Sequence, residues 1–121
     1  MVDLKEIIKC QRNFDKKLGW YWNSSTDEEK IKYLQYSVIA LAEEVGEFAG
    51  VVKKILREHG TMKKLPEKKI EKLREELIDI FIYIIKVGDQ VLAMDIEKEF
   101  FKKLKTNEER FKVQNTKIPS T

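Results

Sequence analysis

The chain has 121 residues, of which 42% are hydrophobic and 37% charged, a balance typical of one folded helical domain rather than a disordered chain. Its formal net charge of +3 comes from intermixed acidic and basic residues, so no basic stripe predicts nucleic acid binding. One cysteine, no long apolar span and no apolar signal segment predict a cytoplasmic protein without an intrachain disulfide or a membrane segment.

The first predicted helix lies between Asp3 and Gly19. Asp3 is a suitable N-cap, and Glu6 three residues later is a capping-box-like partner. A broken apolar stripe follows and ends at Gly19, a residue typical of helix C-termini. The next segment contains Trp20, Tyr21 and Trp22, candidates for stacking on a nucleobase, although aromatic residues near a helix end more often cover the core.

The second predicted helix is unusually long. Ser25 and Thr26 each precede a glutamate by three residues, so either can open the helix through a capping box. The apolar pattern then continues to about His59 and Gly60, roughly 33 residues in all, longer than a typical globular helix. We therefore expect this helix to bend or to extend toward a partner subunit.

Two more helices are predicted in the second half. Pro66 suits the first position of the third helix, which continues to about Val91. The fourth begins at Met94 and Asp95 and carries an apolar stripe as far as residue 111. The expected domain spans residues 1–112, and residues 113–121 are predicted to be a disordered tail. Short connections favour an all-α antiparallel four-helix bundle, which we expect oligomerisation to complete.

The second helix contains the acidic cluster EEVGE at residues 43–47. At about 100° per residue, Glu44 falls inside the apolar arc of this helix and Glu47 at its edge, whereas Glu43 points further toward solvent. Lys54, seven residues after Glu47, lies on a nearby face and is a candidate phosphate contact, although most such lysines are only solvated.

A second acidic cluster, EELID at residues 75–79, lies on the third helix. Asp79 is the only polar residue in LIDIFIYII, residues 77–85, so this helix is predicted to be buried nearly all round. A buried ionised carboxylate requires a cation nearby or a shift of its pKa. Glu76 and Tyr83, one turn to either side, share the face of Asp79.

Together the two clusters can bring four carboxylates into one place: Glu44, Glu47, Glu76 and Asp79. Like charges gathered there repel unless a cation neutralises them. Mg²⁺ suits this role because it accepts oxygen ligands and keeps positions for waters and phosphates, and Mn²⁺ is the alternative ion. Chance spacing of acidic residues in a charged helical protein is the competing interpretation.

These motifs resemble the EExxE…ExxD signature of the MazG-like all-α nucleotide pyrophosphohydrolases, which are related to the dimeric dUTPases and dCTP pyrophosphatase. KLKTNEERF, residues 103–111, is similar to the Lys…Asn…Arg pattern that often closes that domain. The similarity covers roughly residues 30–111. The segment WYW, residues 20–22, does not align with the pattern of one subfamily, so the resemblance leaves the preferred substrate open.

The resemblance implies that the four carboxylates hold Mg²⁺, that Lys103 and Asn107 lie near the nucleotide, and that Tyr83 lies at the base pocket. It further implies hydrolysis of a nucleoside triphosphate to a monophosphate and pyrophosphate, by attack of metal-activated water on the α-phosphate. Either Glu43 or Glu75 can orient that water. A homodimer or homotetramer is expected.

Two other functions fit the same residues. The chain can be a non-catalytic helical interaction module whose acidic clusters pair with lysines of a partner. It can also be a nucleotide-binding relative that keeps the ligands without turnover. His59 is the single histidine and lacks a glutamate three residues before it, which argues against a ferritin-like di-iron centre.

Overall fold

The computed structural model describes residues 2–59 and 64–115, and within these ranges the chain is helical and contains no strand. The elements are α1 (Leu4–Leu18), α2 (Asp27–His59), α3 (Glu67–Lys86), the π-helical turn η1 (Val87–Val91) and α4 (Ile96–Asn115). The predicted all-α class is therefore confirmed. No helix among the described residues combines the length and the apolar character needed to cross a membrane.

Local capping chemistry sets the ends of α1 and the start of α2. The backbone N–H of Glu6 donates to the Asp3 carboxylate at 2.9 Å, and Gly19 ends α1 in the left-handed conformation with φ 74°. At α2, the N–H of Glu29 donates to Thr26 Oγ1 at 3.1 Å, and the N–H of Thr26 donates back to the Glu29 carboxylate at 3.2 Å. This reciprocal pair makes Thr26 the capping-box residue.

Two predicted boundaries in the second half differ from the structure, and at a third the type of helix changes. Pro66 is the N-cap of α3 and not its first helical residue, with extended backbone angles of φ −64° and ψ 140°. The third helix does reach Val91, but its last five residues form the wider π turn η1. Helix α4 continues to Asn115, past the predicted start of the tail at residue 113, and residues 116–121 lie outside the described residues.

A tight connection redirects the chain between η1 and α4. Ala93 takes the left-handed conformation with φ 48°, and the Asp95 carboxylate accepts from the N–H of Lys98 at 3.1 Å as the cap of α4. Gly88 leaves room for this connection, since a Cβ there would lie 3.1 Å from side-chain atoms of Met94 and Ile96. The small residue thus allows the chain to turn closely against η1.

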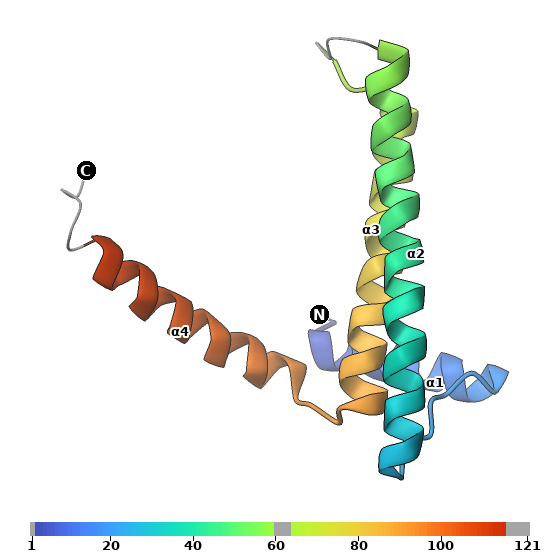
Figure 1. Cartoon of the computed structure of the whole chain (residues 1–121), viewed down its shortest axis with the longest axis vertical. Helices are drawn as coiled ribbons and strands as arrows, with labels where there is room; N and C mark the ends of the chain where they lie inside the picture. The colour runs from blue at the N-terminus through green and yellow to red at the C-terminus, as the bar shows by residue number, and fades with distance from the viewer. Residues whose placement is uncertain (1, 60–63, 116–121) are drawn as a thin grey trace.

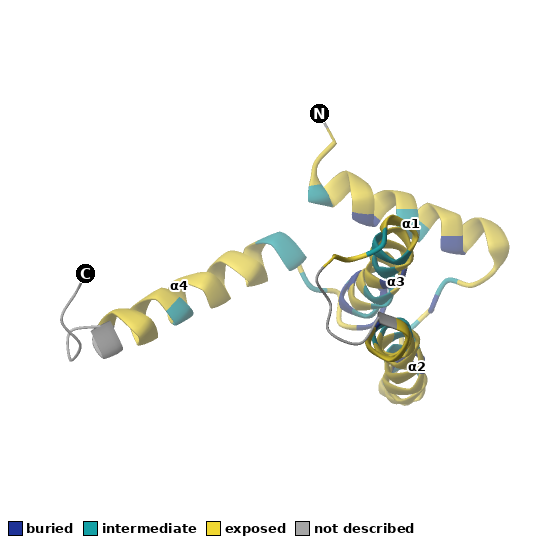
Figure 2. Cartoon of the chain, turned by 90° about the horizontal axis from the view of Figure 1, so that it is seen from above, coloured by how far each residue is buried: buried dark blue, intermediate teal, exposed yellow. Residues whose placement is uncertain are grey.

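Helices α2 and α3 lie side by side along most of their length, while α1 crosses them near one end (Figure 1). The bidentate pair between Arg12 and Asp89, at 2.9 and 2.6 Å, attaches α1 to η1. In both whole-chain views α4 extends away from the α2–α3 pair (Figures 1 and 2). One chain alone therefore does not close the predicted four-helix bundle.

The core is small; it lies mainly where α1, α2, α3 and η1 meet, and Ile55 is buried separately near the C-terminal end of α2. The buried apolar residues are Ile8, Trp22, Ala40, Ile55, Ile85 and Val91. Most of α4 is exposed along its length (Figure 2). The expectation that α3 is buried nearly all round is wrong for the single chain: Asp79 is exposed, as are Leu77, Ile78, Phe81 and Ile84. Too few elements surround α3 within one chain to cover its outer face.

Candidate metal centre

The structure brings four carboxylates together, two from α2 and two from α3. One oxygen from each of four residues lies within 4.8 Å of the others; they are Glu44, Glu47, Glu76 and Asp79. The spacing of three within each pair places both of its members on the same side of one helix. The lateral contact of α2 and α3 then joins the two pairs into one cluster.

The four carboxylates differ in exposure. Glu76 is buried, with 4% of its surface exposed, and Glu44 is partly buried, whereas Glu47 and Asp79 are exposed. The cluster therefore has a buried floor and a side open to solvent. This geometry suits an ion held by protein oxygens on one side and by water or phosphate oxygens on the other.

Two buried oxygens in the cluster lack a hydrogen-bond partner, Glu44 Oε2 and Glu76 Oε2. The other oxygen of Glu76 pairs with the ammonium of Lys72 at 3.1 Å. Among the described residues, Lys72 is the basic side chain in an ion pair with these four carboxylates. One ammonium against four carboxylates leaves excess negative charge, and buried oxygens without partners are costly.

The excess charge changes the acidity of the cluster. Burial raises the pKa of Glu44 above its ordinary value of 4.5, and the charges of Glu47, Asp79 and Glu76 raise it further. Desolvation and then the neighbouring Glu76 raise the pKa of Glu47. The pKa of Lys72 is also raised, by its contact with Glu76. The contribution of the neighbouring carboxylates to each shift favours a positive charge here.

The donor chemistry fits a hard divalent cation. All four groups offer carboxylate oxygens, the ligand type that Mg²⁺ and Mn²⁺ accept, and the described residues add no thiolate or imidazole to the cluster. The unpartnered oxygens of Glu44 and Glu76 would both gain a partner from such an ion. Zinc and iron centres more often include nitrogen or sulfur ligands.

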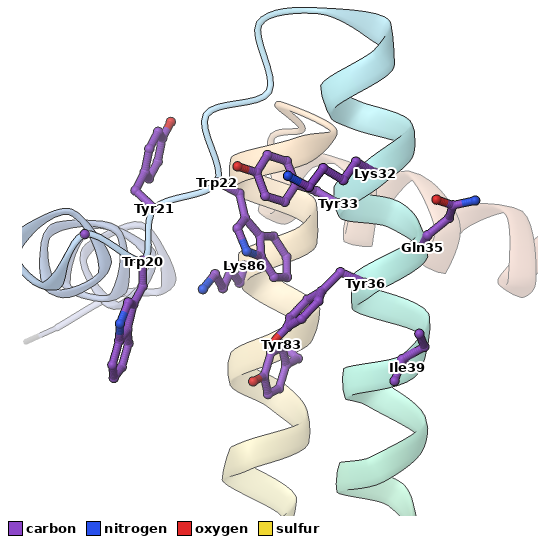
Figure 3. A pocket seen from close by; sticks show the side chains of 11 residues that line it. Trp20, Tyr21, Trp22, Lys32, Tyr33, Gln35, Tyr36, Ile39, Tyr83 and Lys86 are labelled. Carbon is purple, nitrogen blue, oxygen red and sulfur yellow. The ribbon is translucent and has the colours of Figure 1, made fainter.

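An aromatic pocket of about 700 Å³ lies between α2, α3 and the segment that follows α1 (Figure 3). Its walls are mostly aromatic, and they are completed by lysine and glutamine side chains; the aromatic members are Trp20, Tyr21, Trp22, Tyr33, Tyr36 and Tyr83. Aromatic walls with a few polar groups are typical of sites that bind flat organic ligands.

Tyr83 connects the pocket to the acidic cluster. It lines the pocket and lies one helical turn after Asp79 on α3. Burial raises the pKa of its phenol, and the charges of Tyr36 and Glu44 raise it further. The phenol therefore stays protonated at neutral pH and can donate a hydrogen bond.

The tryptophans of the WYW segment have different environments. Trp22 is buried, with 7% of its surface exposed, and Tyr33 stacks on its ring at 5.6 Å. Trp20 is 58% exposed at the edge of the pocket and meets Phe14 edge to face at 6.1 Å. Trp22 thus covers the core, whereas Trp20 keeps surface available to a ligand.

Several predicted site residues lie apart from the cluster. Lys103 and Asn107 are on α4, which extends away from α2 and α3 (Figure 1). Lys54 is exposed on α2, about 10 Å along the helix from Glu47 at 1.5 Å per residue. Glu43 and Glu75 are exposed neighbours of the ligand candidates on α2 and α3, respectively.

Other residues of this region were not predicted. Lys72 pairs with Glu76 at a spacing of four, a pattern readable from the sequence. Tyr33, Tyr36 and Lys86 line the pocket only because α2, α3 and the WYW segment meet there, and no local motif marks them.

A search against protein-family models gives no match for this chain, and no curated protein matches it significantly. The assignment of function therefore depends on the residues of the site.

Proposed function

We propose that this chain is a Mg²⁺-dependent nucleoside triphosphate pyrophosphohydrolase of the MazG-like type, releasing a nucleoside monophosphate and pyrophosphate. The observation that carries the proposal is the cluster of four carboxylates with two unpartnered buried oxygens. The adjacent aromatic pocket supports it, since a nucleotide needs a place for its base beside the metal that meets its phosphates.

The residues of the cluster have distinct tasks in this proposal. Glu44, Glu47, Glu76 and Asp79 would hold Mg²⁺, with Mn²⁺ as a substitute. When bound, the ion supplies positive charge to the phosphates and lowers the pKa of a coordinated water. Glu43 or Glu75, exposed beside the ligands, would accept a hydrogen bond from the attacking water and orient it toward the α-phosphorus.

The pocket would hold the nucleoside. Tyr83 stands one turn beyond Asp79, so a nucleotide with its phosphates at the cluster extends its sugar and base along α3 into the aromatic walls. Trp20 and Tyr36 offer the most exposed aromatic surface there, with 58% and 56% of their surfaces exposed. Stacking on such rings binds any base and contributes about 1–3 kcal/mol per base.

A second copy of the chain would complete the site. Helix α3 exposes an apolar outer face, and α4 exposes Phe100, Phe101, Leu104 and Phe111. Large exposed apolar faces are typical of surfaces that bury one another in an oligomer. In a homodimer or homotetramer, α4 of a neighbouring copy can bring Lys103 and Asn107 to the phosphates and Lys54 can contact them from α2.

The proposal is tested by pyrophosphate release from a panel of canonical and modified nucleoside triphosphates with Mg²⁺. We expect release by the wild type and a loss of at least about a hundredfold in Glu47→Gln, because losing even an outer partner of a metal ligand typically costs 10–100-fold. Asp79→Asn should behave in the same way. The exposed α3 variant Glu71→Gln is the matched control and should keep wild-type turnover.

Two alternatives give different outcomes. The exposed apolar faces also suit a non-catalytic interaction module, for which Mg²⁺ would leave the melting temperature unchanged. A nucleotide-binding relative without turnover would bind nucleotide in the presence of Mg²⁺ yet release no pyrophosphate. Wild-type turnover in Asp79→Asn would show that the proposed metal site is wrong.

A further inference from the structure

Lys86 is a buried cation in the wall of the aromatic pocket (Figure 3). Only 8% of its surface is exposed, and its ammonium lies 4.3 Å from the centre of the Trp22 ring. Burial lowers its pKa, which the charge of Asp15 opposes. A cation in such a place needs a counter-charge or hydrogen-bond acceptors to offset its desolvation.

The carboxylate of Asp15 meets this need only in part. Its Oδ2 lies 3.8 Å from Lys86 Nζ, an ion pair longer than a hydrogen bond. Both oxygens of Asp15 already accept hydrogen bonds, from Gln11 at 3.1 Å and from Gln90 at 2.6 Å. Within residues 2–59 and 64–115, the ammonium of Lys86 makes no hydrogen bond to a protein oxygen. The N–H groups of Lys86 that do not face Asp15 or the Trp22 ring can therefore donate to a ligand.

Trp22 fixes the position of Lys86, and its ring is already in contact with Tyr33. Tyr33 stacks on its ring at 5.6 Å with the planes only 20° apart, and the ammonium of Lys86 also lies over the ring. The backbone N–H of Trp22 donates to Gln90 Oε1 at 3.0 Å, which holds the segment against η1. The cation is thus held in place before a ligand arrives.

The order of groups along α3 matches the order of parts in a nucleotide. From Asp79 in the acidic cluster, Tyr83 lies about 6 Å and Lys86 about 10 Å further along the helix at 1.5 Å per residue. The spacings of four and seven residues keep all three on one side of α3. Phosphates at the cluster therefore place the far edge of the base beside Lys86.

The group at that far edge distinguishes the bases. In a pyrimidine, position 4 lies opposite the nitrogen that carries the sugar; uracil and thymine carry a carbonyl oxygen there, and cytosine carries an amino group. The corresponding group of a purine is the oxygen of hypoxanthine and guanine or the amino group of adenine. An ammonium only donates hydrogen bonds, whereas the tyrosine hydroxyls of the pocket donate and accept.

We propose that Lys86 makes this pocket select nucleobases with a carbonyl oxygen at the far edge over those with an amino group there. The inference rests on the proposed function for the direction in which a nucleotide lies. Lys86 donates a hydrogen bond to the carbonyl oxygen. An amino group at the same position is itself a donor, so neither it nor the ammonium of Lys86 finds an acceptor there.

The test compares the binding of matched nucleotides by calorimetry, with Mg²⁺ present to hold the phosphate at the acidic cluster; monophosphates are products of the proposed reaction and do not turn over. The wild-type protein with Mg²⁺ is titrated with dUMP and dCMP, and separately with inosine and adenosine monophosphates. We expect dUMP and the inosine nucleotide to bind at least about tenfold more tightly than their amino counterparts, since hydrogen bonds to charged groups are worth about tenfold or more. Equal binding, tighter binding of the amino bases, or no binding at millimolar concentration would overturn the inference.

Two variants connect the preference to Lys86. A glutamine amide can donate or accept, so Lys86→Gln should reduce each preference to within about threefold. Because this change leaves Asp15 buried without its cation, the double variant Asp15→Asn/Lys86→Gln removes both charges and keeps the test valid if the single variant does not fold. A preference retained at the wild-type ratio in either folded variant would exclude Lys86 as its source.

Failure of this inference is distinguishable from failure of the proposed function. Pyrophosphate release from dUTP and dCTP at similar efficiency, together with equal monophosphate binding, would leave the enzyme proposal standing and refute the role of Lys86. Selective binding of dUMP without pyrophosphate release from any triphosphate would refute the enzyme proposal and support the base preference.

Discussion

Two charged clusters contact α3, and they differ in how their charges are balanced. Around Asp15, a buried carboxylate accepts two side-chain hydrogen bonds and faces the ammonium of Lys86 at 3.8 Å. In the cluster that contains Glu76, four carboxylates have one lysine in an ion pair with them, and one buried oxygen each of Glu44 and Glu76 lacks a hydrogen-bond partner. The first cluster is close to neutral by itself, whereas the second carries excess negative charge.

The difference separates a cluster with a scaffold role, from which Lys86 also reaches the pocket, from a candidate metal site. The Asp15 cluster joins α1 to η1 and holds the WYW segment through Gln90, so its charges stabilise the arrangement of the chain. The Glu76 cluster joins α2 and α3 while opposing their approach through like-charge repulsion. Such repulsion in a folded protein is consistent with a site whose stability depends on a ligand.

Removing Asp15 should have the largest effect on stability. Asp15→Ala leaves the buried Lys86 without its counter-ion and Gln90 without its acceptor, so we expect a loss of about 3–5 kcal/mol in the free energy of unfolding. Urea denaturation in EDTA measures it. Asp27→Ala, which removes an exposed carboxylate, is the control, and a similar small change in both variants would contradict the scaffold role.

Removing one carboxylate of the Glu76 cluster should stabilise the metal-free protein, whereas removing Asp15 destabilises it. The pKa of Glu44 is raised in the folded protein, so its ionised form destabilises the fold at neutral pH. Glu44→Gln should therefore raise the melting temperature of the metal-free protein by a few degrees, and it should abolish the stabilisation by Mg²⁺ that the proposed metal site predicts for the wild type. Thermal unfolding with EDTA and with Mg²⁺ measures both effects, and Glu71→Gln should change neither.

The stability of the metal-free protein should fall as the pH rises, a smaller effect with the same cause, the ionisation of Glu44 and Glu47 in the folded protein. The pKa values of Glu44 and Glu47 are raised in the folded protein above their ordinary value of 4.5. Their favourable contribution to the stability of the metal-free fold is therefore complete below about pH 4.5, and it is lost as the pH rises through the pKa values that they have in the folded protein. Protons and Mg²⁺ compete for these oxygens, so the stabilisation by Mg²⁺ should grow over the same interval. A stabilisation that stays constant from pH 4.5 to 7.5 would argue against these two ligands.

The sequence predicted the features that depend on neighbours within one helix. The Asp3 cap and the Gly19 terminus were readable because each uses backbone groups within a few residues, and the second helix start was narrowed to Ser25 or Thr26, of which the structure uses Thr26. The pairing of Glu44 with Glu47 follows from the helical repeat, which needs no tertiary contact.

Only the tertiary structure decided which charged groups are buried and what balances them. Glu76, not Asp79, is the buried carboxylate on α3, because α2 covers one side of that helix and leaves the other exposed. Asp15 meets Lys86 and Gln90 across more than 70 residues of sequence, a contact that no local pattern encodes. Burial and charge pairing depend on which helices pack together, whereas caps and spacing depend only on the helix that contains them.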